Sequence, residues 1–264
     1  MPGGACGAVT SYAGRHAELY DLIYADKPYE AESRCVDGLI REFDDGKGGR
    51  RLLEMACGTG RHALQLEWLG HEVNASDYSA SMVAVAQARG KAEGASARFE
   101  VRDMRTLGLT GAGFDSAVCL FDSIGYLQTN DGIRAALGEI HAALRPGGVF
   151  VFEFWHAPAM LRSYDPVRVR RIEVPGRELV RISETSLDVA RQLCTVAYEI
   201  LELYPDGRYS RVREAQQNRY FFVPEMALFL ESAGFAPLTF RAGYTDSEVI
   251  DESTWHVLAV ARRR

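Results

Sequence analysis

Apolar positions follow two different spacings along this chain, and the change between them marks its organisation. From about residue 51 to residue 154, short apolar runs of strand length alternate with segments whose apolar residues recur at helical spacing. Strands that alternate with helices are joined by right-handed crossovers and form a parallel sheet. The predicted strands are Arg51–Ala56, Glu72–Ser76, Arg98–Val101, Ser116–Phe121 and Val149–Phe154, and the predicted helices are Arg61–Trp68, Ser81–Ala92 and Asp131–Leu144.

The residues before this unit also have helical spacing. The pattern runs from about Ser11 to Phe43 and breaks at Lys27-Pro28, because the residue before a proline is biased away from helix. A polar run, DDGKGG, then ends the segment. We expect residues 1–50 to form a helical cap on a core that spans residues 51–160.

The pattern changes again after Trp155. Between about Arg168 and Phe222, β-rich runs are separated by turns such as Tyr204-Pro-Asp-Gly207. This pattern predicts an antiparallel sheet, inserted over residues 161–223 after the fifth parallel strand. The edges of such a sheet must be covered, which favours a homodimer formed through it.

The last residues, 224–264, complete the core. A helix is predicted at Pro224–Ser232, and two strands are predicted at 237–244 and 254–263. The fold class is therefore α/β, a doubly wound sheet with a helical cap and an antiparallel insertion.

Composition narrows the range of partners. The chain has 264 residues, of which 47% are hydrophobic, enough for a sizeable core, and its formal net charge is -6. Basic residues are scattered except for Arg262–Arg264 and the group Arg168, Arg170 and Arg171. This distribution argues against a nucleic-acid partner.

The cysteines and the N-terminus indicate the cellular compartment in which we expect the protein. The five cysteines include no C-x-x-C pair, so we expect neither a metal site nor a disulfide framework. Cys119 and Cys194 lie in apolar runs and should be buried. No basic region followed by an apolar run begins the chain, and no apolar run has transmembrane length. We expect a cytoplasmic protein with no membrane partner.

One stretch, from Leu52 to Asp77, joins a strand, a glycine-rich turn, a helix and a second strand that ends in a carboxylate. Such a unit binds a ribose-bearing cofactor at the carboxyl edge of a parallel sheet. The turn Gly58-Thr-Gly60-Arg-His-Ala63 satisfies the nicotinamide fingerprint G-x-G-x-x-G/A, so the turn alone does not choose the cofactor.

Three neighbouring features favour a different cofactor. Glu54 lies just before the turn, where a carboxylate opposes a pyrophosphate but favours an ammonium and a sulfonium. Asp103 and Met104 follow the third strand and offer the polar group and the apolar face that an adenine needs. Asp77 ends the second strand, where a ribose diol binds. The nicotinamide alternative also lacks a separate substrate domain with a proton-relay constellation.

The segments LLEMACGTG, SDYSASMVAVA, VRDM and LRPGGVFVFE resemble, in the correct order, the motifs of class I S-adenosylmethionine-dependent methyltransferases, between Arg51 and Glu153. The resemblance implies a Rossmann-like seven-stranded sheet whose last strand is antiparallel, and S-adenosylmethionine as the cofactor. It implies Gly58 and Gly60 beside the methionyl part, Asp77 on the ribose, Tyr78 and Met82 flanking the adenine, Asp103 on its amine and Met104 on its face. The other predicted cofactor contacts are Tyr20, Glu54, Ala56 and Leu120.

Two further patterns, F-x-S-I-G-Y-L-x-T from Phe121 and E-x-W-x-x-P from Glu153, resemble the amino-sugar N-methyltransferases of antibiotic pathways. Those enzymes dimethylate the 3-amine of nucleotide-linked deoxysugars. They share an antiparallel insertion and an N-terminal Tyr-Asp pair like Tyr20-Asp21. The chain departs from their pattern at Asp122, where they tend to have serine, and at His156, where they tend to have a second tryptophan.

The type of acceptor decides which catalytic groups are needed. A hydroxyl needs a general base within hydrogen-bond reach, whereas an amine needs only to be neutral. The candidate catalytic residues are His156, Tyr126, Asp122 and Tyr20, with His256 more remote. The candidate substrate contacts are Tyr24, Ser123, Trp155 and Arg219. Arg219 has two interpretations, a contact to a phosphate or carboxylate of the substrate, or a salt bridge on the strand surface.

Three functions stay open at this point. The first is methyl transfer to a small natural-product intermediate, either at an amine of a nucleotide-linked amino sugar or at a hydroxyl. The second is glycine- or sarcosine-type N-methylation, which a smaller pocket with an arginine would support. The third is a non-catalytic protein that keeps the cofactor fold for binding or dimerisation. The intact Glu54, Asp77 and Asp103 argue against the third.

Overall fold

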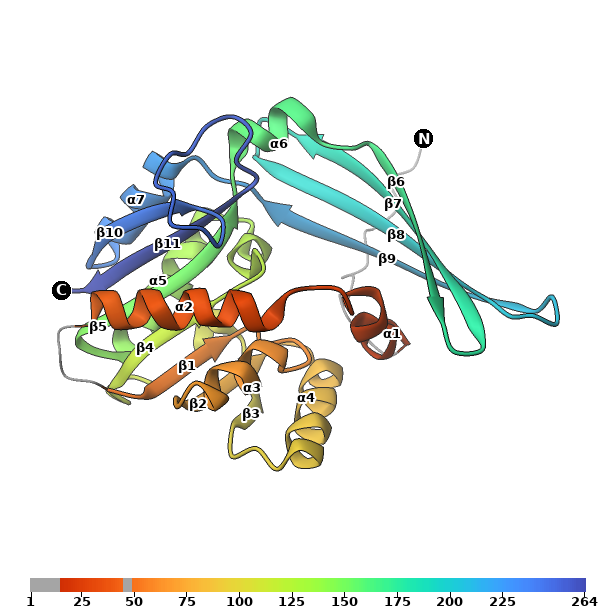
Figure 1. Cartoon of the computed structure of the whole chain (residues 1–264). Helices are drawn as coiled ribbons and strands as arrows, with labels where there is room; N and C mark the ends of the chain where they lie inside the picture. The colour runs from red at the N-terminus through yellow and green to blue at the C-terminus, as the bar shows by residue number, and fades with distance from the viewer. Residues whose placement is uncertain (1–14, 45–48) are drawn as a thin grey trace.

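A computed structural model describes residues 15–44 and 49–264 (Figure 1). The start of the predicted cap, residues 1–14, and most of its closing polar run, residues 45–48, lie outside the described residues. Within the described residues, a mixed sheet is covered by helices on both faces, and a second sheet projects from one side of it.

The larger sheet has seven strands in the order β10-β11-β5-β4-β1-β2-β3. The first five strands of the chain pair in parallel, and β11 runs antiparallel to both of its neighbours. The prediction of a Rossmann-like sheet with an antiparallel last strand is therefore confirmed. The strands are β1 (Arg51–Met55), β2 (Glu72–Asp77), β3 (Arg98–Val101), β4 (Phe114–Cys119), β5 (Leu144–Trp155), β10 (Phe235–Ala242) and β11 (His256–Arg263).

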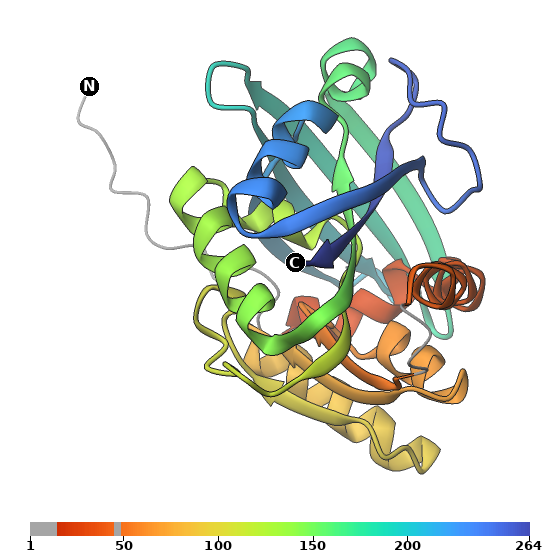
Figure 2. The same ribbon diagram turned by 90° about the vertical axis from the view of Figure 1, so that its left-hand side faces the viewer.

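Side chains of this sheet alternate between two apolar cores, because successive strand residues point to opposite faces. On β4, Ala117 and the buried Cys119 belong to one core and Val118 to the other. Figure 2 shows α5 and α7 on one side of the sheet and α2 on the other. The helices of the first core are α5 (Asn130–Ala143) and α7 (Val223–Ser232), and those of the second are α2 (Tyr29–Phe43), α3 (Arg61–Trp68) and α4 (Ala80–Glu93).

The structure differs from the predictions in the start of one strand and in three short helices that were not predicted. β5 begins at Leu144, which pairs with Phe114, so the strand starts earlier than the predicted residue 149. Here Arg145 reaches both Asp115 and Asp44, at 2.7 and 2.8 Å, and these ion pairs hold the residues before the glycines extended. A short helix without a sequence signal, α6 (Ala157–Ser163), follows β5. Two 3₁₀ helices, η1 (Met104–Thr106) and η2 (Ser123–Leu127), follow β3 and β4.

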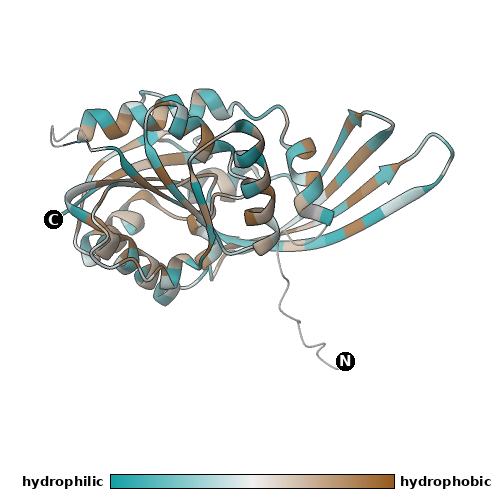
Figure 3. Cartoon of the chain, turned by 90° about the horizontal axis from the view of Figure 1, so that it is seen from below, coloured by the Kyte–Doolittle hydropathy of each residue, from teal (hydrophilic) through white to brown (hydrophobic). Residues whose placement is uncertain are grey.

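The second sheet is antiparallel, with the order β6-β7-β8-β9, as predicted for the insertion. Its hairpins extend well beyond the core (Figure 1), and hydrophilic and hydrophobic residues alternate along them (Figure 3). The strands are β6 (Val167–Val174), β7 (Arg177–Asp188), β8 (Leu193–Leu203) and β9 (Tyr209–Arg219).

Helix α1 (Arg15–Ile23) joins the two sheets. Arg15 at its start pairs with the buried Glu202 of β8, at 2.7 Å. Asp21 near its end accepts a hydrogen bond from the Thr59 hydroxyl at 2.8 Å and pairs with Arg89 of α4. The helix is thereby held against the carboxyl edge of the parallel strands and the inner face of the insertion at once (Figure 1).

Two properties of the described residues bear on partners. None of their helices has both the length and the apolarity that crossing a membrane requires. Their His, Cys, Asp and Glu side chains form no group placed to hold a metal ion.

The two glycines of the turn after β1 should differ in how much they tolerate a side chain. Both have positive φ angles, 56° at Gly58 and 79° at Gly60, which strain any other residue. A Cβ at Gly60 would also lie 2.8 Å from the Phe99 ring, whereas a Cβ at Gly58 meets nothing within 4 Å. We expect Gly58→Ala to lower the free energy of unfolding by about 1 kcal/mol and Gly60→Ala by about 2–3 kcal/mol. Urea unfolding of both variants measures this, and equal losses would contradict the contact with Phe99.

Candidate functional site

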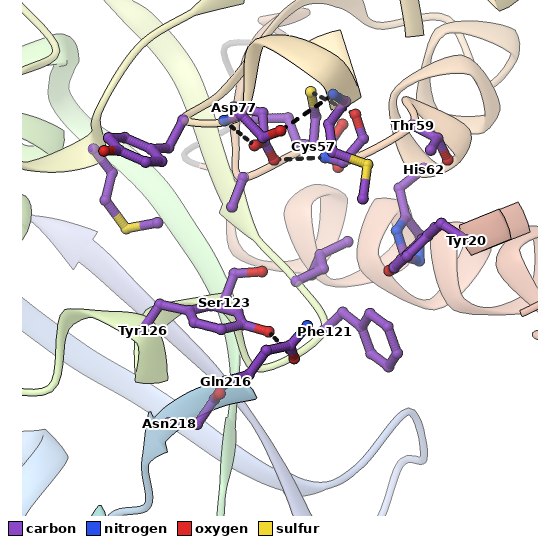
Figure 4. A pocket seen from close by; sticks show the side chains of 18 of the residues that line it. Tyr20, Cys57, Thr59, His62, Asp77, Phe121, Ser123, Tyr126, Gln216 and Asn218 are labelled. Atoms are coloured by element: carbon purple, nitrogen blue, oxygen red, sulfur yellow. Dashed lines mark hydrogen bonds between the residues drawn. The ribbon is translucent and has the colours of Figure 1, made fainter. Parts of the chain in front are cut away.

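A cavity of about 390 Å³ opens at the carboxyl ends of β1, β2 and β4 and extends to the inner face of β8 and β9 (Figure 4). Loops at this edge of a parallel sheet are the usual place for a ligand. The cap, the core and the insertion all contribute to its walls. The predicted site residues that line it are Tyr20, Tyr24, Glu54, Ala56, Gly58, Asp77, Tyr78, Met82, Asp103, Met104, Leu120, Ser123, Tyr126 and Trp155.

The carboxylate of Asp77 organises the glycine turn. Its Oδ2 accepts a hydrogen bond from the Gly58 N–H at 2.9 Å, and its Oδ1 accepts one from the Ser79 N–H at 2.7 Å. Ser79 in turn caps α4 by accepting from the Met82 N–H. Burial raises the pKa of Asp77 above its ordinary value. One carboxylate thus fixes the turn and the start of the helix that flank one side of the cavity.

Glu54 is the strongest electrostatic feature of the cavity. Its side chain is 2% exposed, and its Oε2 has no hydrogen-bond partner. Burial, followed by the nearby charge of Asp77, raises the pKa of Glu54 to about 8. A buried carboxyl without a hydrogen-bond partner destabilises the fold unless a ligand supplies that partner. The group is suited to a cation that enters the cavity.

Arg61 and Tyr29 offer a positive charge and a hydroxyl donor, in contrast to the Glu54 carboxyl. Neither residue was predicted from the sequence. Both line the cavity, and the Arg61 guanidinium lies 4.5 Å from the centre of the Tyr29 ring. Among the described residues no carboxylate pairs with Arg61, and the buried Tyr29 hydroxyl has no hydrogen-bond partner. Together with Glu54 they suit a ligand that carries both an ammonium and a carboxylate.

The side of the cavity near β3 is apolar with one carboxylate. Asp103 is paired with Arg105, whose hydrogen bonds lower the pKa of Asp103 below its ordinary value. Met82 is buried, whereas Tyr78 is 68% exposed at the rim. Met104, Met82 and Tyr78 provide flat or flexible apolar surface of the kind that holds an aromatic ring system.

The opposite side of the cavity is built from aromatic rings and amides. The ring centres of Tyr20 and Tyr24 lie 4.7 Å apart, and Phe121 meets Tyr24 edge-on at 5.3 Å. The Tyr126 hydroxyl donates to Gln216 Oε1 at 3.0 Å. Asn218 lies beside Gln216 on the same side (Figure 4).

Four of these wall residues come from the insertion and were not predicted: Val196, Tyr198, Gln216 and Asn218. The register pairs Val196 with Gln216 and Tyr198 with Glu214 across β8 and β9, so these side chains share one face. The available signal was the polar run Gln216-Gln-Asn-Arg219 at the end of β9. It indicates a face that contacts something polar, but not which cavity that face meets.

Asp122 lies behind the wall of the cavity and does not line it. It is 1% exposed, Oδ1 accepts from the Trp155 N–H at 2.8 Å, and Oδ2 accepts from Asn218 Nδ2 at 3.0 Å. Burial raises its pKa well above the ordinary value. The prediction of Asp122 as a base in contact with substrate is corrected: its carboxylate orients the Asn218 amide and the end of β5.

His156 and Arg219 are not brought to the cavity either. His156 lies in a separate groove with Pro158 and Asp251, and its Nδ1 lies 3.1 Å from the Thr254 carbonyl oxygen. Burial lowers the pKa of His156. Arg219 is buried and bonds Asn130 at 2.6 Å and Glu225 at 2.5 Å, so it forms an internal ion pair rather than a surface salt bridge or a substrate contact.

Two other predicted positions lie outside the cavity wall. Gly60 turns the chain into α3 and is packed against Phe99. His256, the remote base candidate, lies with its Nδ1 2.6 Å from Glu153 Oε1. Although burial opposes ionisation, hydrogen bonds from His256 and Tyr244 hold the pKa of Glu153 at about 2. Glu153 also accepts from the Phe121 N–H at 2.8 Å and thus positions the end of β4.

Comparison with known proteins agrees with this geometry. Residues 52–148 match the model of a family described as a methyltransferase domain. The chain is 33% identical over 234 residues to the dTDP-3-amino-3,6-dideoxy-alpha-D-glucopyranose N,N-dimethyltransferase of Streptomyces fradiae, and the match covers 87% of each protein.

Solved structures agree as well. The sugar N-methyltransferase KedS8 from Streptoalloteichus sp. is similar over 100% of both chains, with 25% identity and a TM-score of 0.78. CalS10, an amino pentose methyltransferase from Micromonospora echinaspora in complex with S-adenosylmethionine, is 26% identical with a TM-score of 0.76, over 93% of this chain and 97% of that one.

The buried Glu54 should make stability depend on pH. In the unfolded chain a glutamic acid ionises near 4.5, whereas Glu54 in the folded protein ionises near 8. Between these values only the folded state keeps the proton, so the free energy of unfolding falls as pH rises from about 4.5 to about 8. Relative to Glu54→Gln, we expect the wild type to lose on the order of a few kcal/mol over this range. Urea unfolding of both proteins across the range measures the difference, and two parallel curves would contradict it.

Proposed function

Because the chain belongs to the S-adenosylmethionine-dependent methyltransferases, we propose that it transfers methyl groups to the amine of a nucleotide-linked amino sugar. S-adenosylmethionine is its cofactor, and when bound it supplies a methyl carbon activated by the attached sulfonium. The proposed acceptor is supported by the named activity of the Streptomyces fradiae relative and by the chemistry of the cavity wall opposite Glu54.

The residues on the β1–β3 side of the cavity suit the cofactor group by group. We assign Glu54 to the ammonium, because its buried carboxyl has no other partner. Arg61 and the Tyr29 hydroxyl suit the carboxylate. Asp77 faces the cavity at the end of β2 and suits the ribose hydroxyls, while Met104, Met82 and Tyr78 suit the adenine.

The observation that carries the proposed acceptor is that, among the described residues, the aromatic side of the cavity offers tyrosine hydroxyls but neither a carboxylate nor a histidine that could act as a strong general base. The histidine that lines the cavity, His62, lies at the start of α3 and bonds Glu32 at 2.7 Å. Asp122 uses both oxygens behind the wall, and His156 faces another groove. A hydroxyl acceptor would need such a base, whereas a neutral amine needs position and an exit for its proton.

The chain's own residues can provide that position. Asp122 accepts from the Nδ2 of Asn218, which leaves the Asn218 Oδ1 as the end of the amide that can face an acceptor. This oxygen favours an N–H or O–H donor on the sugar beside the reacting nitrogen. The Tyr126 hydroxyl donates to Gln216 and thereby fixes the neighbouring amide of the same wall. The rings of Tyr20, Tyr24 and Phe121 also suit the ammonium that forms at the nitrogen with each methyl transfer, before it loses its proton.

We expect methyl transfer to dTDP-3-amino-3,6-dideoxyglucose to show no titration of an essential enzyme base. The logarithm of the maximal rate should rise with pH until the substrate amine is deprotonated. His156→Ala should change the rate less than about threefold, because the residue is outside the cavity. Tyr126→Phe should raise KM more than it lowers kcat. A loss of about 10²–10⁴ in His156→Ala, the usual effect of removing a general base, would overturn the amine assignment.

We also propose that two copies pair through the outer face of the insertion. The inner face is covered by α1 and the cavity, whereas the outer face exposes Val167, Val169 and Tyr209 at 58%, 57% and 67%. Val167 and Val169 lie on β6 at one edge of the sheet and Tyr209 lies on β9 at the other edge, and residues of both charges, such as Arg171 and Glu184, share the face with them. A face with mixed charges and exposed apolar side chains is suited to self-association about a two-fold axis.

Light scattering at micromolar concentration tests this pairing. We expect the mass of a dimer for the wild type and a shift to monomer for Val169→Asp, because a buried unpaired charge opposes association. Val189→Asp is the matched control, since Val189 is equally exposed, at 60%, but lies in the turn after β7. A monomeric wild type would overturn the dimer and leave the proposed activity intact.

A further inference from the structure

One arginine beside the cavity has no carboxylate partner. Arg181 lies on β7 with its guanidinium carbon 5.5 Å from the centre of the Tyr24 ring and 5.0 Å from that of Tyr198. Both rings line the cavity. The hydrogen bond that Arg181 makes runs from Nη1 to the Tyr24 hydroxyl oxygen at 3.1 Å, and its buried Nε has no acceptor. In the part of the chain that the structure describes, no salt bridge neutralises this guanidinium.

Other arginines of the insertion are placed differently. On the same face, Arg177 pairs with Glu202 at 2.7 Å, and Arg170, the cross-strand neighbour of Arg181, pairs with Asp26 at 2.8 Å. A partly buried cation that lacks a counterion is costly, and a bound anion would remove that cost. The rings of Tyr24 and Tyr198 offset only part of it.

Two further donors accompany the guanidinium. Because the Tyr24 oxygen accepts from Arg181, its own hydroxyl proton is left to donate, and no described residue accepts it. Ser183 follows Arg181 on the same face of β7, is 6% exposed, and has a hydroxyl without a partner. Ser183 pairs in register with Tyr198, which keeps it next to the same ring. Of the carboxylates on this face, Glu202 on β8 pairs with Arg15 and Arg177, and Glu214 on β9 accepts from Gln216 and is separated from β7 by β8.

We infer that Arg181, Tyr24 and Ser183 form a subsite for an anionic group of the acceptor, and that this group is a phosphate. The inference rests on the proposed function and names the part of the acceptor that this side of the cavity binds. A guanidinium with adjacent hydroxyl donors matches the several oxygens of a phosphate. Tyr24 and Tyr198 line the cavity whereas Arg181 and Ser183 do not, so the subsite adjoins the cavity at these two rings.

This position distinguishes a phosphate from the carboxylate of an amino acid. In an α-amino acid, the carboxylate and the reacting nitrogen are attached to the same carbon, so both would have to fit inside the aromatic wall. In a sugar nucleotide, the ring of the sugar separates the reacting amine from the diphosphate. A charge that adjoins the cavity at two of its aromatic rings therefore suits the sugar nucleotide.

Binding of thymidine diphosphate to the protein saturated with S-adenosylhomocysteine tests the subsite by calorimetry. We expect Arg181→Met to weaken this binding about 10- to 100-fold, the effect of losing charge-assisted hydrogen bonds, while affinity for thymidine stays unchanged. Arg181→Lys should restore part of the loss, because it keeps the charge but not the fork of donors. Ser183→Ala should cost less than about tenfold. Arg134→Met, which removes an exposed arginine from α5, is the matched control.

Several outcomes would overturn the subsite. Equal affinity for thymidine diphosphate in the wild type and Arg181→Met would remove Arg181 from the phosphate site. A parallel loss for thymidine would indicate a structural effect. Glycine binding that depends on Arg181, without binding of thymidine diphosphate, would assign the subsite to a carboxylate. Methyl transfer to an amino sugar without a phosphate tests the proposed function separately, since it requires the cofactor and the amine site but not Arg181.

Discussion

The hydrogen bonds that the Asp77 carboxylate accepts from the N–H groups of Gly58 and Ser79 fix the edge on which the cavity is built. They hold the glycine turn after β1 and the start of α4 in one arrangement. They also place the Asp77 carboxylate close to Glu54, whose pKa is raised to about 8 by burial and, to a lesser extent, by this neighbouring charge. Without a ligand, this arrangement leaves the buried Glu54 carboxyl without a hydrogen-bond partner at its Oε2, which lowers the stability of the fold. This cost becomes binding energy when a cation takes the place of the missing partner.

The other side of the cavity depends on contacts between residues far apart in the chain. Arg15 reaches Glu202, and Asp21 reaches Thr59 and Arg89, so α1 is fastened to both sheets. This places Tyr20 and the adjoining Tyr24 between the core and the insertion. Tyr24 then orients Arg181, and Asp122 orients Asn218. The acceptor side is thus assembled from pairs in which a residue that lines the cavity is hydrogen-bonded to one that does not.

One side of the cavity is built from a local segment and the other from segments far apart in the chain, and this difference explains what could be predicted from the sequence. The unit from β1 to β2, with Glu54, Gly58 and Asp77, is local, and its hydrophobic period and turn residues predict both its fold and its place at the cavity. The four-stranded insertion was predicted from its turns and β-rich runs. Arg61 and Tyr29 were missed because an arginine in the first turn of a helix and a tyrosine after a proline are ordinary in any protein. Their significance is that, among the described residues, the Tyr29 hydroxyl finds no hydrogen-bond partner and Arg61, which lies over the Tyr29 ring, finds no carboxylate.

Several predicted site residues that do not line the cavity are one position away from residues that do. Trp155 lines it, and His156, next in extended backbone, points into another groove. Gln216 and Asn218 line it, and Arg219 points the other way. In a strand, successive side chains lie on opposite faces, so an error of one residue moves a side chain from one compartment to another. The face of an inserted strand that meets the active site is set by packing of the two sheets, which no local pattern encodes. For this reason His156 and Arg219 were predicted from their residue type, whereas the amides Gln216 and Asn218 were identified only from the structure.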